Sequence, residues 1–176
     1  PWVNVCGTNA TQAYFNNLHH QMKEMVNNLY NHPSIAFWGM WNELDTWGNN
    51  NDLQGPLDAE RVVKETERLY NYTKKLDPDR FVGFTDCSNL SRDGYTSLKG
   101  DFCSQNLYYG WDRTPNEFSG FTTTLKKVRG LRSDIPINVS EYGVGVNPYC
   151  HVWNPVEAIR DKDEDSKHYE EYGNRF

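Results

Sequence analysis

The chain lacks the closely spaced cysteines that bind zinc, because Cys6, Cys87, Cys103 and Cys150 are widely separated. We therefore expect buried free thiols there. It also lacks any apolar run near the ~20 residues that a membrane-spanning helix needs, so a helical membrane span is excluded. Lysine and arginine number 18 against 24 acidic residues, and a net charge of -6 without a basic stripe argues against nucleic acid as a partner.

Aromatic residues are abundant instead, with 6 Trp, 11 Tyr and 8 Phe among 176 residues. Large rings in polar surroundings suit sugar binding, although they suit an ordinary core as well. The length allows one domain with a real core, and no repeat or low-complexity tract interrupts it. Because the sequence begins at Pro1 rather than Met, we read it as a fragment of a larger protein.

Hydrophobic periodicity predicts an alternation of helices and strands. Helices are expected at about 11–30, 57–76 and 118–128, with a further one near 169–176. Strands are expected at 35–41, 81–85, 102–108 and 135–140, and the first is apolar on both faces, as in a covered parallel strand. Such an alternation calls for right-handed crossovers and a parallel sheet, so the predicted fold class is α/β.

Two glutamates stand where predicted strands end. Glu43 follows the first strand within Asn42-Glu43, and Glu141 follows the fourth. The carboxyl ends of parallel strands converge on one crevice, and two acids there suggest glycoside hydrolysis, which needs one acid and one nucleophile or base. Strand-end glutamates also cap helices and pair with arginines, so the residues alone leave both interpretations open.

The stretch Asn31-His-Pro-Ser-Ile-Ala-Phe-Trp-Gly-Met-Trp-Asn-Glu43 resembles the acid/base strand of glycoside hydrolase family 2. Four further segments resemble the same family in order and spacing: Trp2-Val-Asn4, Asn106-Leu-Tyr-Tyr-Gly-Trp111, Val139-Ser-Glu-Tyr-Gly143 and His168-Tyr-Glu-Glu-Tyr172. The resemblance implies a partial (β/α)8 TIM barrel over residues 1–176, comprising about strands four to seven with their helices. It implies no cofactor, and we transfer no metal site.

The resemblance also implies residue roles. Glu43 would be the general acid/base and Glu141 the nucleophile. Asn42 would bind the sugar 2-hydroxyl, and Tyr108 would donate a hydrogen bond to Glu141. In a retaining enzyme the two carboxyl groups stand ~5 Å apart, and Glu43 later activates water.

Two further residues are candidate substrate contacts. Trp111 follows a strand end and is interpreted as a pocket wall. His151, ten residues after Glu141, resembles a histidine that follows the nucleophile loop in many β-galactosidases. Blander interpretations stay open for each candidate: a turn residue for Asn42, a core ring for Tyr108 or Trp111, and a surface residue for His151.

The residues in these motifs resemble those of β-galactosidases more than those of β-glucuronidases, which favours β-galactosides as the carbohydrate substrate. The alternatives are a β-glucuronidase or another retaining glycosidase of the same barrel clan, and a noncatalytic carbohydrate-binding remnant. A partial barrel would also leave open sheet edges, which favours a homo-oligomer. The compartment is not indicated.

Overall fold

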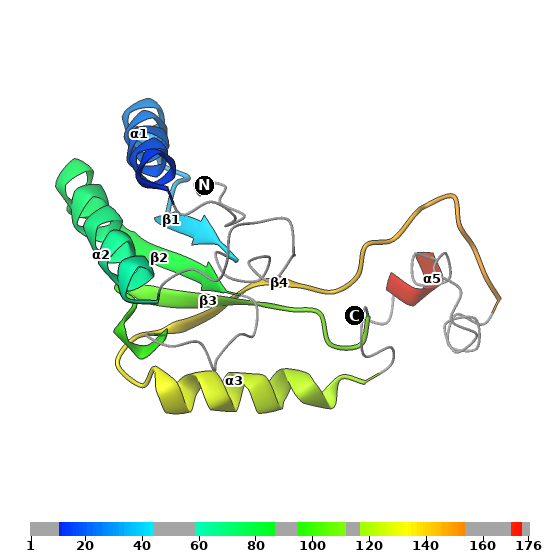
Figure 1. The fold of residues 1–176 in the computed structure, drawn as a ribbon. Helices are drawn as coiled ribbons and strands as arrows, with labels where there is room; N and C mark the ends of the chain where they lie inside the picture. Colours follow the sequence, from blue (N-terminus) through cyan, green and yellow to red (C-terminus); the bar gives the residue numbers. More distant parts are fainter. Residues whose placement is uncertain (1–10, 44–58, 87–94, 112–116, 154–169, 174–176) are drawn as a thin grey trace. The chain divides into compact units, whose positions relative to one another are not determined.

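The computed structural model describes residues 11–43, 59–86, 95–111, 117–153 and 170–173, in which helices and strands alternate (Figure 1). In chain order they are α1 (Gln12–Leu29), β1 (Phe37–Asn42), α2 (Ala59–Leu76), β2 (Phe81–Asp86), the 3-10 helix η1 (Tyr95–Ser97), β3 (Phe102–Leu107), α3 (Ser119–Leu131), β4 (Ile137–Tyr142) and α5 (Glu170–Gly173). The predicted elements are confirmed, with boundaries shifted by up to two residues in most cases.

The strands form one sheet in the order β1, β2, β3, β4. β1 pairs with β2, and β2 with β3, in parallel. Neighbours in the sheet are thus neighbours in the sequence, and the intervening segments contain helices, as the right-handed crossover of a barrel requires. The predicted parallel sheet is confirmed.

The chain divides into two compact units. Unit 1 comprises Pro1–Gln105 and Val128–Asn138, and unit 2 comprises Asn106–Lys127 and Val139–Phe176. The boundaries fall inside β3 and β4, so both strands run from one unit into the other. Glu43 belongs to unit 1 and Glu141 to unit 2.

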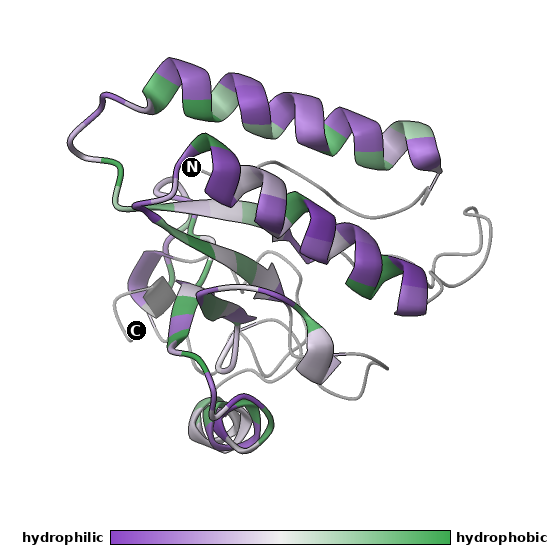
Figure 2. Cartoon of the chain, turned by 90° about the vertical axis from the view of Figure 1, so that its left-hand side faces the viewer, coloured by the Kyte–Doolittle hydropathy of each residue, from purple (hydrophilic) through white to green (hydrophobic). Residues whose placement is uncertain are grey.

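The core of unit 1 lies between the sheet and two amphipathic helices. α1 begins after Thr11, whose side chain accepts a hydrogen bond from the Tyr14 N–H at 3.2 Å and so caps the helix. α1 contacts α2, and α2 contacts β1 and β2. Figure 2 shows hydrophobic and hydrophilic bands along the helices, the pattern of a helix with one buried face. Fully buried side chains of this core include Met22, Trp38, Met40, Val82 and Phe84.

Asp77 joins the end of α2 to the segment that enters β1. Its buried carboxylate accepts hydrogen bonds from the Trp38 indole at 2.9 Å and from the Arg80 guanidinium at 2.7 Å. Arg80 also donates to the carbonyl oxygens of Ile35 and Tyr30, at 2.9 and 2.8 Å. Sequence analysis identified this region only as the stop signal of a helix.

The sequence predicted that β1 is covered on both faces, but the structure leaves the start of this strand exposed on one face. Trp38 and Met40 are buried toward the helices, whereas Phe37 is 42% exposed and its β2 partner Phe81 is 65% exposed. The reason is that α1 and α2 lie against one face of this sheet. An apolar run alone does not tell which of its side chains a helix will cover.

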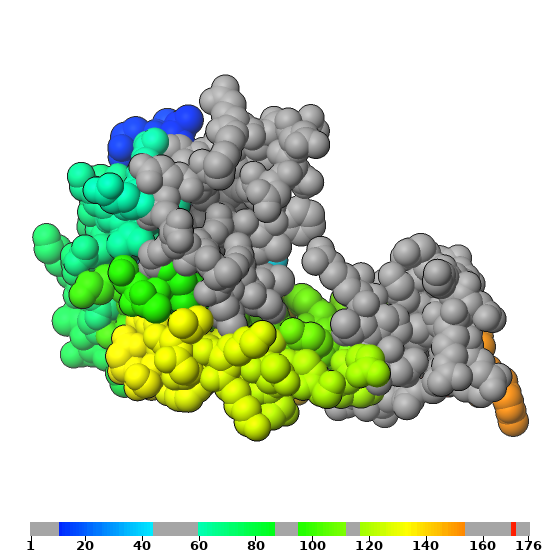
Figure 3. Space-filling view, turned by 60° about the horizontal axis from the view of Figure 1, so that its bottom comes forward, coloured from blue at the N-terminus to red at the C-terminus, as the bar shows by residue number. Residues whose placement is uncertain are grey.

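α3 and β4 differ in detail from the prediction. Phe118, an expected helix residue, precedes α3 and is 40% exposed, whereas Thr124 and Val128 are buried along the helix. Part of α3, in yellow, lies at the surface (Figure 3). β4 extends to Tyr142, so Glu141 lies within the strand rather than after it.

The cysteine prediction is confirmed in part. Cys103 and Cys150 are free thiols, and Cys103 is fully buried, but Cys150 is only half-buried. Cys6 and Cys87 lie outside the described residues. No helix in the described part of the chain is both long and apolar enough to span a membrane.

Candidate active site

Glu43 directly follows β1 and has a special backbone conformation. Its side chain is 9% exposed, and its φ of 49° is the one positive value among the non-glycine residues that the structure describes. Its N–H donates to the Thr85 carbonyl oxygen at 3.1 Å, which ties this strained residue to β2. Strained left-handed residues cost about 1–3 kcal/mol and concentrate at functional sites, which makes Glu43 a candidate on geometry alone.

The end of β1 is irregular just before Glu43. The pairing with β2 shifts between Gly39 and Asn42, and Met40 and Trp41 are consecutive buried residues. Such irregularities break the alternation of a strand and redirect the side chains that follow. Asn42, half-buried and paired with Thr85, is the last residue of the strand. The predicted strand-end position of the Asn42-Glu43 pair is therefore confirmed.

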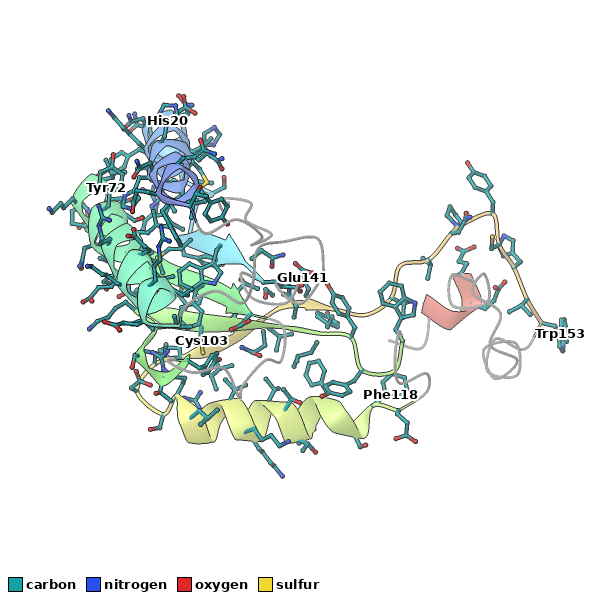
Figure 4. All side chains as sticks on the ribbon, in the orientation of Figure 1. His20, Tyr72, Cys103, Phe118, Glu141 and Trp153 are labelled. Carbon is teal, nitrogen blue, oxygen red and sulfur yellow. The ribbon has the colours of Figure 1, made fainter. Side chains whose placement is uncertain are left out.

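Glu141 of β4 is bound by Tyr108, the residue that follows β3. The Tyr108 hydroxyl donates a hydrogen bond to Glu141 Oε2. The predicted contact is therefore present, and Figure 4 shows Glu141 at the end of β4. The hydrogen bond orients the Glu141 carboxylate, as a nucleophile at this position requires.

Trp111 packs against Tyr108 rather than standing alone. The two ring centroids are 5.8 Å apart at an interplanar angle of 67°, an edge-to-face arrangement. The Trp111 N–H also donates to the Tyr108 carbonyl oxygen at 3.1 Å. Trp111 is thus a neighbour of the residue that binds Glu141, and its predicted contact with substrate stays a prediction.

Two pairs of polar side chains connect β3 and β4 before this contact. Asn138 Nδ2 donates to Ser104 Oγ at 3.1 Å, and the Ser140 hydroxyl donates to Asn106 Oδ1 at 2.7 Å. Sequence analysis missed these pairs. The alternation of polar residues at 104 and 106, and at 138 and 140, was the available signal. Ser104 and Asn106 are buried in β3, where a parallel strand is usually apolar, whereas the face of β4 that carries Asn138 and Ser140 is exposed.

His151 contacts two glutamates of α5. His151 Nδ1 lies 2.9 Å from Glu171 Oε1 and 3.6 Å from Glu170 Oε2. The backbone adds two hydrogen bonds, from the Val152 N–H to Glu171 Oε2 at 3.2 Å and from the Glu170 N–H to the Cys150 carbonyl oxygen at 3.1 Å.

These contacts shift the pKa values of His151 and Glu171. The hydrogen bond and the charge of Glu171 raise the pKa of His151, while a backbone hydrogen bond and His151 lower the pKa of Glu171. His151 therefore carries a partner that sequence analysis did not foresee, and its predicted role in substrate binding stays untested.

The candidate residues form three groups. Asn42 and Glu43 lie together in unit 1, Tyr108, Trp111 and Glu141 form a contact cluster in unit 2, and His151 pairs with α5 in unit 2. Among the described residues, no group of three or more His, Cys, Asp or Glu side chains could hold a metal ion. The chemistry available is that of carboxylates with a tyrosine donor, as in acid and nucleophile catalysis.

The sequence matches the model of a protein family described as glycosyl hydrolases family 2, TIM barrel domain, over residues 4–172. A β-glucuronidase of Bacteroides fragilis is 35% identical over 130 residues, which cover 73% of this chain and 16% of that protein. Human β-glucuronidase is 31% identical over 107 residues, covering 58% of this chain and 15% of that protein. The chain therefore spans under a fifth of the length of these relatives.

Solved structures agree with the sequence comparison. A Bacteroides uniformis β-glucuronidase superposes with a TM-score of 0.75 at 26% identity, covering 99% of this chain and 20% of that one. Bacteroides uniformis β-glucuronidase 2, covalently bound to cyclophellitol-6-carboxylate aziridine, superposes with a TM-score of 0.70 at 27% identity, covering 88% of this chain and 19% of that one. The predicted partial TIM barrel is confirmed.

These relatives correct one expectation. The residues of the motifs favoured a β-galactosidase, but the relatives described above are β-glucuronidases. The glucuronidase alternative therefore has the better support. The motifs that surround the carboxylates do not carry the choice of sugar, because specificity depends on pocket residues elsewhere in such a barrel. The chain belongs to the glycosyl hydrolases of family 2 and matches their TIM barrel domain.

Proposed function

We propose that this chain carries the catalytic pair of a retaining β-glucuronidase, with Glu43 as general acid/base and Glu141 as nucleophile. The observation that supports it most directly is the hydrogen bond from the Tyr108 hydroxyl to Glu141, in a chain of family 2. The preference for a glucuronide rests on the relatives that bear that name.

In the first step Glu141 attacks the anomeric carbon while Glu43 gives its proton to the leaving oxygen. A covalent glycosyl-enzyme results, and Glu43 then removes a proton from the water that hydrolyses it. The covalent complex of Bacteroides uniformis β-glucuronidase 2 with a 6-carboxylate inhibitor supports such an intermediate and a ligand with a carboxylate.

The environments of the two glutamates suit these roles. Glu141 accepts a hydrogen bond from Tyr108, which orients its carboxylate. Glu43 is buried at 9% exposure at the end of the apolar strand β1. In TIM barrels the carboxyl ends of the strands carry the active site, and both glutamates lie at such ends.

The other candidates take supporting roles in this proposal. Asn42 would bind the 2-hydroxyl of the sugar, where hydrogen bonds strengthen in the transition state. Trp111 would form a wall of the pocket. His151 would contact the substrate or order the loop that contains His151.

The proposal is tested with a panel of nitrophenyl glycosides on the intact protein. We expect turnover of the β-glucuronide, with retention of configuration in the first-formed product as seen by NMR. Glu141→Gln should lower kcat by roughly 10⁴-fold or more, the scale seen when a nucleophile is removed. Turnover of the β-galactoside but not the β-glucuronide would reject the sugar assignment, and full activity of Glu141→Gln would reject the mechanism.

A further inference from the structure

The turn between β3 and α3 is held by several specific contacts. The Trp111 N–H bonds to the Tyr108 carbonyl oxygen at 3.1 Å and closes a four-residue turn. Gly110 has a φ of 94°, the left-handed value that the third residue of a type II turn requires. Tyr108, which binds Glu141, is the first residue of this turn.

The start of α3 holds the turn from outside. The Phe118 ring occupies the space beside Gly110, where a Cβ atom would overlap it. Figure 4 shows Phe118 beside the first turn of α3. The turn is therefore fixed at its third residue by both backbone conformation and packing.

Tyr109 provides the second attachment to α3. Its ring lies against Gly120, at which any Cβ atom would collide with it. Its hydroxyl is 2.8 Å from the hydroxyl of Thr124, which is buried at 6% exposure. One tyrosine of the turn is thus anchored on α3, while the preceding tyrosine reaches Glu141.

We propose that the Tyr109–Thr124 pair is a positioning element of the catalytic site, which holds the turn so that the Tyr108 hydroxyl stays on Glu141. This inference rests on the proposed function. The path runs from α3 to Tyr109, along the backbone to Tyr108, and from its hydroxyl to the nucleophile. Trp111 limits the remaining freedom, because its ring packs edge-on against Tyr108. A misplacement of about 1 Å at such a group can cost about 100-fold in rate.

The test uses Tyr109→Phe and Thr124→Val in the intact protein. Each removes one hydroxyl of the pair and keeps the side-chain shape. Each should lower kcat about five- to tenfold, the kinetic equivalent of one hydrogen bond, with little change in KM.

Coupling to Tyr108 separates positioning from general stability. In a Tyr108→Phe background, Tyr109→Phe should have no further effect on kcat, because the path to Glu141 is already cut. Equal losses in both backgrounds, or an unchanged kcat in folded Tyr109→Phe, would overturn the proposal.

Two matched controls remove a hydroxyl elsewhere. Tyr70→Phe loses the 2.7 Å hydrogen bond to Asp101 in unit 1, and Thr123→Val loses the 3.2 Å hydrogen bond to the Ser119 carbonyl oxygen next to Thr124. When the variants are compared at equal folded fraction, both controls should leave kcat unchanged.

Failure of the proposed function has a different signature. If the unmutated protein hydrolyses no glycoside, crystal structures of Tyr109→Phe and Gly120→Ala decide the inference instead. Gly120→Ala displaces the Tyr109 ring by steric overlap, so Tyr108 should leave Glu141 in that variant. A Tyr108 hydroxyl that stays on Glu141 in both structures would overturn the positioning role.

Discussion

Each of the two units of the chain is stabilised internally by a different kind of contact. In unit 1, large apolar side chains such as Trp38, Met40 and Phe84 are fully buried between α1, α2 and the sheet. In the described part of unit 2, Leu107 is the one hydrophobic side chain of the buried core, while Tyr142, Tyr149 and Trp153 are 67%, 91% and 101% exposed.

Order in unit 2 comes instead from polar and ring contacts. Tyr108 bonds to Glu141, Tyr109 to Thr124, and His151 to Glu171. The proposed acid/base is therefore supported by a packed core, and the proposed nucleophile by directional hydrogen bonds. Activity should respond to small polar changes in unit 2 that leave overall stability nearly unaltered.

The largest expected difference follows from truncating a large ring in each unit. Phe84→Ala should lower the free energy of unfolding by about 4 kcal/mol, because a fully buried ring leaves a cavity. Tyr149→Ala removes a 91% exposed ring and should change it by less than about 0.5 kcal/mol. Urea denaturation of both variants checks this, and similar losses would show that unit 2 also depends on apolar burial.

Asp77→Ala should have the next largest effect. It removes a buried carboxylate from Trp38 and Arg80, and breaking such a pair costs about 3 kcal/mol. Burial opposes the charged form, but the hydrogen bonds from Arg80, Trp38 and the backbone N–H groups outweigh it and lower the pKa of Asp77.

The lowered pKa gives this contribution a pH dependence. The stabilisation is complete above the ordinary aspartate pKa of about 3.9 and is lost as the pH falls through the folded-state value. Asp77→Asn should therefore flatten the acid side of the stability curve. An unchanged curve in thermal melts from pH 6 to pH 2.5 would contradict this.

Glycine substitution of the two catalytic candidates should change stability in opposite directions. Glu43→Gly relieves the positive φ and should raise the free energy of unfolding by up to about 1 kcal/mol. Glu141→Gly places glycine in a regular strand and should lower it by about 0.5–1 kcal/mol. Both variants should lose activity, and destabilisation by Glu43→Gly would mean that its contacts outweigh its strain.

The smallest predicted effect concerns the pKa of one histidine in each unit, His19 in unit 1 and His151 in unit 2. Burial and Arg68 lower the pKa of His19, so its contribution to stability is lost as the pH falls below the ordinary value of about 6.5. Glu171 raises the pKa of His151, so that contribution is present below about 6.5 and is lost as the pH rises through the folded-state value.

An NMR titration of the histidine ring protons checks both directions. The two residues should titrate on opposite sides of the ordinary value. Glu171→Gln should return His151 toward it and leave His19 unaffected. Titration of both residues on the same side would contradict the assigned surroundings.

Sequence analysis predicted the elements well because their signals are local. The spacing of Phe15, Leu18 and Met22 defines a helical face, and Pro33 ends the helix region before β1. It also placed Glu43 at a strand end and paired Tyr108 with Glu141 through the family resemblance. Sequence analysis did not predict the features that depend on contacts between segments distant in the sequence.

Three misses share that cause. The exposure of Phe37 depends on which face the helices cover, and the hydroxyl pair of Tyr109 and Thr124 joins residues 15 positions apart. His151 meets Glu171 across 20 positions. The expected preference for β-galactosides, which the relatives support less well than the glucuronidase alternative, has a related cause, since the specificity of a barrel enzyme lies in loops that the motif residues do not include.

The polar pairs between β3 and β4 have a consequence for strand register. A slip of one residue turns each side chain of a strand to its other face. Asn138 with Ser104, and Ser140 with Asn106, are satisfied in one alignment, and that alignment places Glu141 within reach of Tyr108. A single-residue insertion before Glu141 would thus turn the carboxylate away even if every catalytic side chain were kept, so the length of β4 is itself part of the site.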